Sequence, residues 1–284
     1  MDPARARRLL QQHLRTDQLL GLDAVPTHPA SVAPSIRGLT SADSPPAQAP
    51  DANPGPAPQP RSTPTPTEAP TPRLTAAPPP IELDPALPKD EALARLREHL
   101  AQNQGVLAKL LPGTQLVFGE GDPEAEIMFI GEGAGADEAR TGRPFVGTAG
   151  QLLDQMIKAM GLAREQVYIT NVVHFQPPGN RVPTPDEVDL GWPYMIGQVQ
   201  IVQPKVIVAV GGTSAKALLN TTTGITRLRG QWKSFDAVQP AIPLMPTFHP
   251  AFLLRSYTRE NRSKVWNDLL AVLAHLGKEP PKRG

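Results

Sequence analysis

Cysteine is absent from the 284-residue sequence. Its absence excludes disulfide bonds, thiol catalysis, and zinc or iron–sulfur centres held by cysteine. No run approaches the roughly 18 apolar residues that a membrane-spanning helix needs, so we expect no membrane partner. The N-terminus has arginines but no apolar segment followed by a cleavage site, which predicts a cytoplasmic protein. The net charge of +1 points to no class of partner, so a nucleic-acid site would have to come from local clusters of basic residues.

Aromatic residues are missing from the stretch between Pro26 and Pro88, which instead holds nineteen of the 35 prolines. Such a stretch buries too little apolar surface to offset its ordering entropy, so residues 23–89 are predicted to be a disordered linker. Residues 90–277 then form the folded domain and 278–284 a tail. Residues 1–22 predict a short helix with a partial leucine stripe. It either packs on the domain or docks a partner on a flexible tether, and the sequence leaves both open.

Short apolar runs alternate with helical patterns along the folded domain. The runs are residues 126–131, 167–171, 205–211 and 243–248, and the helical patterns include 150–160, 186–202, 214–220 and 262–275. This alternation predicts a three-layer α/β/α sandwich with a short four-stranded parallel sheet. Right-handed crossovers put the loops after the strands at one edge of the sheet, where ligands bind in open α/β folds.

The loop after the first strand, GEGAGADEARTGRPFVGTAG, combines glycines with an aromatic residue. Gly131, Gly133 and Gly135 allow the backbone to approach a ligand closely. The loop matches neither a Walker motif nor the dinucleotide fingerprint. Phe145 is positioned to stack on a flat ligand, although alone it would be equally consistent with an ordinary core residue.

Two later strands also end in polar residues. Asn171 ends the second run, and its amide offers the adjacent donor and acceptor that complement a base edge. A loop-capping role is an equal alternative for Asn171 taken by itself. His249 directly follows the fourth run, in PTFHPAFLLR, and a lone histidine at such a place is more often structural than catalytic.

Basic and apolar residues gather on the same loops. An apolar pair beside a cation can enter a base stack while the cation holds a phosphate. The predicted DNA-binding residues are Arg181, Arg227, Arg229, Leu253, Leu254 and Arg255.

The motifs GEGAGADEARTGRPFVGTAG, VYITNVVHFQPPGNRVPTPDE and PTFHPAFLLR occur in this order. In this respect the chain resembles the thermophile-type, iron–sulfur uracil-DNA glycosylases often called family four, over roughly residues 107–270. The resemblance implies an enzyme that flips uracil from DNA and hydrolyses its N-glycosidic bond, leaving an abasic site.

The resemblance also implies roles for single residues. Asn171 would bind the Watson–Crick edge of uracil, Phe145 would stack on its face, and the backbone of Gly131, Gly133 and Gly135 would close the pocket. His249 would stabilise the leaving anion near uracil O2. Glu138 and Glu132 are the candidates to hold the attacking water.

The sequence departs from the family at the positions that bind the iron–sulfur cluster. The four cysteine ligands of the family correspond to Gln104, Leu107, Phe175 and Gly191, none of which binds iron. We therefore expect no metal and no cofactor, and hypothesise that Leu107 and Phe175 pack together with Trp192 to hold the same loops. Smaller departures are Ala134, Ala139 and His174.

The expected partner is uracil-containing DNA, single- or double-stranded, bound by a monomer. The N-terminal arm is the candidate contact for a repair or replication partner. Two alternatives remain open: a non-catalytic, DNA-binding or damage-sensing relative, and a glycosylase for another deaminated base such as hypoxanthine or xanthine.

Overall fold

A computed structural model of the chain describes residue 81 and residues 84–281. The predicted N-terminal helix and nearly all of the predicted linker lie outside these residues. The first described helix, α2, begins at Lys89, where Pro88 is the N-cap residue.

A six-stranded sheet forms the middle layer, in the order β1-β3-β2-β4-β6-β5. Its four inner strands are parallel, as predicted, and β1 and β5 pair antiparallel at the two edges. The strands are β1 (Glu120–Gly121), β2 (Ile127–Gly131), β3 (Tyr168–Asn171), β4 (Val206–Val210), β5 (Lys233–Phe235) and β6 (Ile242–Thr247). The prediction of a four-stranded sheet therefore missed two edge strands, because runs of two and three residues are too short to show an alternating pattern.

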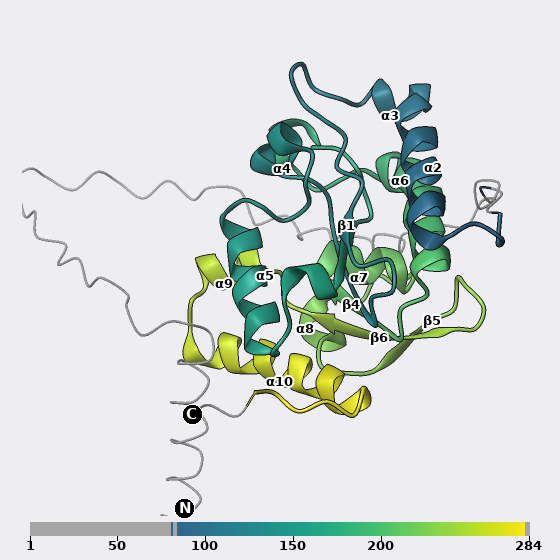
Figure 1. Cartoon of the computed structure of the whole chain (residues 1–284). Coiled ribbons are helices and arrows are strands. Elements are labelled where there is room, and N and C mark those ends of the chain that lie inside the picture. Colours follow the sequence, from purple (N-terminus) through teal and green to yellow (C-terminus); the bar gives the residue numbers. More distant parts are fainter. Residues whose placement is uncertain (1–80, 82–83, 282–284) are drawn as a thin grey trace, which may run out of the picture. The chain divides into compact units, whose positions relative to one another are not determined.

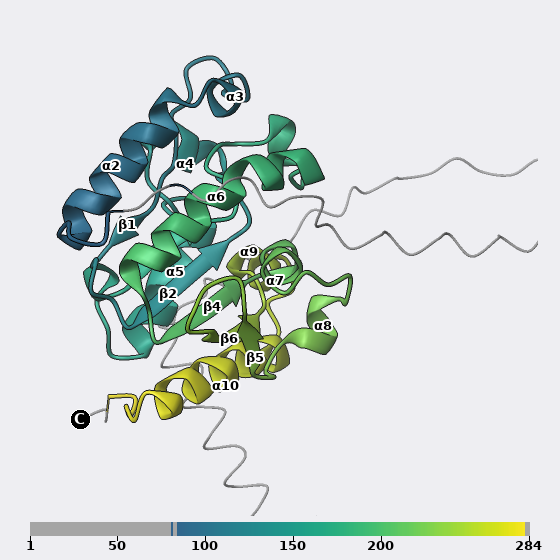
Figure 2. The same cartoon turned by 90° about the vertical axis from the view of Figure 1, so that its right-hand side faces the viewer.

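Helices cover both faces of the sheet, which confirms the three-layer class. In β2, Met128 and Ile130 join the core cluster that includes residues of α2 and α6, whereas Ile127 and Phe129 join the cluster that includes residues of α5 and α10. Successive strand side chains point to opposite faces, so a strand covered on both sides is apolar throughout. Figures 1 and 2 show these two pairs of helices on either side of the strands.

The long helices agree with the helical patterns, and the short ones were not anticipated. The α-helices are α2 (Lys89–Gln102), α3 (Gln104–Leu107), α4 (Ala136–Thr141), α5 (Thr148–Ala159), α6 (Pro185–Val202), α7 (Gly212–Leu218), α8 (Ile225–Leu228), α9 (Pro250–Arg255) and α10 (Arg259–His275). Two 3-10 turns, η1 (Arg164–Gln166) and η2 (Pro178–Asn180), also occur among the described residues. Helices of four to six residues such as α4, α8 and α9 span too little sequence to reveal a period of 3.6. Within the described residues, no helix combines the length and hydropathy needed to cross a bilayer.

Local capping fixes the loop that follows β3. Thr184 caps α6 and accepts a hydrogen bond from the backbone N–H of Glu187, while the Glu187 carboxylate accepts one from the N–H of Thr184. Arg181 donates to both oxygens of the same carboxylate, at 2.7 and 2.8 Å. This capping box with a bidentate arginine ties Arg181, the last residue of the Pro-Pro-Gly-Asn-Arg loop, to the first turn of α6.

Candidate active site at the carboxyl edge of the sheet

Gly131 and Asn171 end two neighbouring parallel strands and are opposite each other in the register of β2 and β3. Asn171 is 1% exposed, and its Oδ1 has no hydrogen-bond partner among the described residues. A Cβ on Gly131 would lie 2.4 Å from Asn171 Oδ1 and 2.5 Å from Phe145 Cζ. Only glycine therefore allows this amide and this ring to meet at the strand end. A buried acceptor without a partner costs about 1–3 kcal/mol, so the site is set up to receive a donor.

The Phe145 ring lies against the His249 imidazole, with 5.7 Å between ring centroids and 29° between the planes. The structure therefore brings together Phe145, Asn171 and His249, which come from the ends of three different strands or the loops beyond them. Gly211, at the end of β4, adopts φ +102°, and a Cβ there would lie 3.1 Å from the Cβ of His249. Glycine at this position leaves room for the His249 side chain and allows the positive φ.

His249 is held in one tautomer by the start of α9. His249 is the N-cap residue of α9, and its Nδ1 accepts a hydrogen bond from the backbone N–H of Ala251 at 3.1 Å. In the neutral ring the proton is then on Nε2, which becomes a donor. Burial lowers the pKa of His249 to about 4, and the positive charge of Arg255 acts in the same direction. The imidazole is neutral near pH 7.

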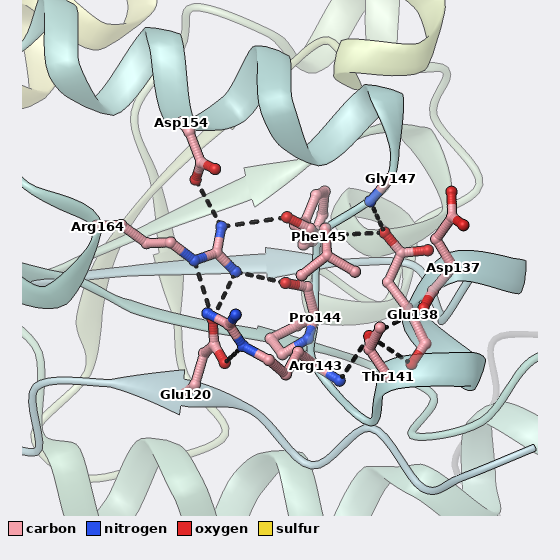
Figure 3. A network of polar contacts seen from close by, with 11 residues as sticks. Glu120, Asp137, Glu138, Thr141, Arg143, Pro144, Phe145, Gly147, Asp154 and Arg164 are labelled. Atoms are coloured by element: carbon pink, nitrogen blue, oxygen red, sulfur yellow. Dashed lines mark hydrogen bonds and ion pairs between the residues drawn. The ribbon is translucent and has the colours of Figure 1, made fainter.

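Glu138 is bound inside the glycine-rich loop. Its Oε1 accepts hydrogen bonds from the backbone N–H groups of Val146 and Gly147, each at 2.9 Å (Figure 3). Its Oε2 accepts one from the backbone N–H of Gly135 at 3.1 Å. The carboxylate thus ties the start of α4 to the segment that follows Phe145. Glu132, the other predicted acid, is half-buried directly after β2.

Arg164, which sequence reasoning missed, contacts the backbone of the stacking residue. Its guanidinium donates to the carbonyl oxygens of Phe145, at 3.2 Å, and of Pro144. It also binds Glu120 and Asp154 (Figure 3). The only signal in the sequence is an arginine shortly before a buried strand, and that pattern carries no indication of its partners.

The predicted DNA-binding residues divide into two groups. Leu254 is 43% exposed, and Arg181, Arg227 and Arg255 are exposed as well. Leu253 is instead fully buried in the core cluster with α5 and α10, so only one leucine of the pair is available as a wedge.

Arg229 also differs from the expectation. Its guanidinium binds both carboxylate oxygens of Asp268, which is 2% exposed, and the carbonyl of Lys264. Thr247 donates to the same carboxylate at 2.7 Å. Burial raises the pKa of Asp268 above its ordinary value, although the bonds from Thr247 and Arg229 act against this. Arg229, directly after α8, is therefore tied to α10 rather than facing solvent, while Thr247 ties the same Asp268 to the end of β6.

The positions that correspond to cluster ligands do not fit an iron–sulfur cluster. Phe175 is fully buried and Trp192 packs against the same core. A Cβ on Gly191 would lie 2.3 Å from the carbonyl oxygen of Val172, which leaves no room there for a cysteine without a shift of the backbone. Leu107 is half-buried and lines a groove of about 270 Å³ with Leu100 and Phe118. Gln104 is exposed at the start of α3.

His174, another departure from the family, is buried beside this region. Its Nε2 is 2.8 Å from Gln198 Nε2, and burial lowers the pKa of His174 to about 3. It is therefore a neutral core residue and does not present a charge to the candidate site.

Residues 118–270 match the family model described as the uracil DNA glycosylase superfamily. The chain is 41% identical to the Type-4 uracil-DNA glycosylase of Thermotoga maritima over 170 residues, which is 58% of this chain and 85% of that protein. It is 38% identical to the Type-4 enzyme of Archaeoglobus fulgidus over 172 residues, 59% of this chain and 85% of that protein. The Type-4 enzyme of Sulfurisphaera tokodaii is 47% identical over 146 residues, 50% of this chain and 66% of that protein.

Proposed function

The chain belongs to the uracil DNA glycosylase superfamily, and from this membership we propose that it excises uracil from DNA in base-excision repair. The reaction hydrolyses the N-glycosidic bond and leaves an abasic site. The observation that supports this best is the meeting of Phe145, Asn171 and His249 at one edge of the sheet.

Asn171 and Phe145 recognise the base in this proposal. Flipping a base from the stack costs roughly a few kcal/mol, which contacts in the pocket must offset. The unpartnered Oδ1 of Asn171 accepts from uracil N3–H, and the amide nitrogen donates to O4. Cytosine has an acceptor at N3 and an amine at position 4, so the same amide orientation rejects it. The Phe145 ring supplies the stacking surface.

His249 stabilises the leaving group. Cleavage of the glycosidic bond leaves negative charge on the base and positive charge on the sugar. A neutral imidazole that donates from Nε2 to uracil O2 strengthens its hydrogen bond as the charge develops, which for a well-placed donor contributes about 3–4 kcal/mol. Because the base leaves as an anion, the reaction needs no thiol nucleophile.

Glu138 and Glu132 are the acids that we assign to the attacking water. The Oε2 of Glu138 accepts one N–H, which leaves a second lone pair for water. Glu132 lies directly after β2, at the same edge of the sheet. Glu132→Gln tests Glu132, because the amide keeps an acceptor oxygen but loses the charge. In Glu138→Gln the amide nitrogen would also face a backbone N–H that the carboxylate now accepts, so the rate is read together with the melting temperature.

DNA contacts come from the exposed members of the predicted set. Leu254 enters the stack where uracil has left, and Arg181, Arg227 and Arg255 bind phosphates. We propose that the protein acts as a monomer in the cytoplasm on single- and double-stranded DNA, and that residues 1–22 contact a repair or replication partner.

The proposed enzyme works without an iron–sulfur cluster, and the apolar packing around Phe175 and Trp192 takes the structural place of the cluster. Purified protein should contain no iron and show no absorbance band near 400 nm. Either signal would contradict this part of the proposal.

A labelled oligonucleotide with one deoxyuridine tests the activity. After incubation and alkali treatment, wild-type protein should cleave it, while Asn171→Ala and His249→Ala should lose most of the cleavage. Binding without cleavage would instead support a non-catalytic relative. Parallel oligonucleotides with hypoxanthine or xanthine define the base range.

A further inference from the structure

Phe145 has an unusual backbone conformation for an aromatic residue. Its φ is +50°, in the left-handed region, and its side chain is 5% exposed. Bulky residues rarely adopt positive φ, and such residues persist where the surrounding structure over-determines them. The orientation of the Phe145 ring therefore depends on whatever holds its peptide groups.

Two side chains of opposite charge hold these peptide groups, as Figure 3 shows. Arg164 donates to the carbonyl oxygens of Pro144 and Phe145, and Glu138 accepts from the N–H groups of Val146 and Gly147. The peptide group between Phe145 and Val146 is thus bound at both its oxygen and its nitrogen. Rotation of this peptide group would break a charge-assisted hydrogen bond on each side.

Arg164 is itself fixed in place and only 14% exposed. Its Nε donates to Glu120 Oε1 at 2.9 Å and its Nη1 to Asp154 Oδ1 at 2.6 Å, so carboxylates from β1 and α5 orient the guanidinium. On the other side, a Cβ on Gly150 would lie 1.9 Å from the carbonyl oxygen of Phe145. The first turn of α5 therefore closes over the same peptide group.

We propose that Arg164 is a positioning residue, which sets the plane of the Phe145 ring for stacking on the flipped base. The inference rests on the proposed function, because it assigns a role to Phe145 in that reaction. Within the part of the chain that the structure describes, Arg164 makes no hydrogen bond to His249 or Asn171. It acts instead through the backbone carbonyl groups of Pro144 and Phe145.

Arg143 provides a matched control. It binds Glu120 with Nε at 2.8 Å and Nη2 at 2.9 Å, so it shares the carboxylate partner of Arg164. Among the described residues, Arg143 makes no hydrogen bond to the carbonyl oxygen of Phe145. Arg143→Gln therefore removes a neighbouring ion pair of the network and leaves the carbonyl bonds of Arg164 in place.

The test is a double-mutant cycle between Arg164 and Phe145, with the full-length chain and single-turnover excision of uracil as the readout. Arg164→Gln should lower the excision rate by about ten- to a hundredfold, as misplacement of a substrate-contacting group does. In a Phe145→Ala background the same substitution should change the rate less than about twofold, because the ring that it positions is gone. Arg143→Gln should stay within about threefold of wild type.

Arg164→Lys serves as the second variant if Arg164→Gln fails to fold. Lysine keeps the charge near Glu120 and Asp154 but lacks the planar guanidinium that reaches two carbonyl oxygens at once. Arg164→Lys should therefore lower the excision rate less than Arg164→Gln, with the same dependence on Phe145. Melting temperature is measured for every variant, and its change should be similar in both Phe145 backgrounds.

Equal rate losses in the two backgrounds would overturn the proposal, since Arg164 would then support the domain generally. An Arg143→Gln loss as large as that of Arg164→Gln would do the same. If the wild-type chain releases no uracil, the proposed function fails, and the cycle is read instead on binding of a deoxyuridine oligonucleotide relative to its thymidine counterpart. The same background dependence is expected there, and equal losses in the two backgrounds would again contradict the role of Arg164.

Discussion

Asn171 Oδ1 lies 2.4 Å from the place that a Cβ on Gly131 would occupy, across the last register pair of two parallel strands. The absence of a side chain at Gly131 thus makes space for the amide that we assign to uracil recognition.

Gly131→Ala should therefore reduce uracil excision by about a hundredfold, because the methyl group displaces both Asn171 and Phe145. Single-turnover kinetics measure this effect. Gly212→Ala is the control, since a Cβ there meets Ile225 at an ordinary 3.7 Å. Excision at the wild-type rate by Gly131→Ala would refute the assignment of this strand end as the uracil pocket.

The pH dependence of excision should lack a titration of His249 near its ordinary pKa of about 6.5. Burial lowers the pKa of His249 to about 4, so the ring stays neutral from pH 8 down to about pH 5 and is protonated only below that. The unfolded chain takes up this proton near pH 6.5. The contribution of His249 to stability is therefore complete above pH 6.5 and is lost as the pH falls towards 4.

Measured excision rates between pH 4 and pH 8 check the first part, and melting temperatures over the same range check the second. A rate that falls with a midpoint near 6.5 would mean that the imidazole is exposed in the free enzyme. In His249→Gln, which cannot titrate, the difference in melting temperature between pH 7 and pH 5 should be smaller than in wild type.

Arg227 and Arg229 are close in sequence but should behave differently when replaced. Arg229→Met leaves the buried Asp268 carboxylate without its cation, so it should lower the free energy of unfolding by about 3–5 kcal/mol. Arg227→Met should leave stability nearly unchanged and weaken DNA binding, with a salt dependence reduced by about one phosphate contact. Denaturant unfolding and DNA titrations at several salt concentrations separate the two. If Arg229→Met weakened DNA binding as Arg227→Met does but left the free energy of unfolding unchanged, the structural role of Arg229 would be contradicted.

Leu253 and Leu254 form a second contrasting pair. Leu253→Ala should cost about 2–5 kcal/mol of stability, because the side chain is fully buried. Leu254→Ala should keep the melting temperature and slow excision from duplex DNA more than from single strands, since only a duplex leaves a gap in a paired stack. The ratio of duplex to single-strand rates measures this effect. An unchanged ratio in Leu254→Ala would exclude the wedge role.

Part of this architecture could be predicted because it depends on local pattern. Buried strands and amphipathic helices extend over enough residues to show their period, and parallel strands bring their carboxyl ends together. That geometry predicted loops gathered at one edge of the sheet, and the resemblance to the glycosylase family singled out Phe145, Asn171 and His249 among their residues.

The rest depends on contacts that no local pattern records. Arg229 binds Asp268 from 39 positions away in the sequence, so its burial could not be anticipated. Which leucine of the pair faces solvent depends on how the six-residue helix α9 is oriented. The contacts of Arg164 with Glu120 and with the Phe145 carbonyl likewise exist only once β1, α5 and the glycine-rich loop are assembled.

The two edge strands of the sheet are two and three residues long, and each runs against its neighbour. Such short edge strands offer few unpaired backbone N–H and C=O groups to another chain. Long, exposed edge strands are the ones that promote aggregation. The parallel strands, whose apolar sequences would be the most prone to such association, are enclosed by these edge strands. We expect this domain to form no β-aggregates at high protein concentration, or when its edge strands β1 and β5 unfold locally.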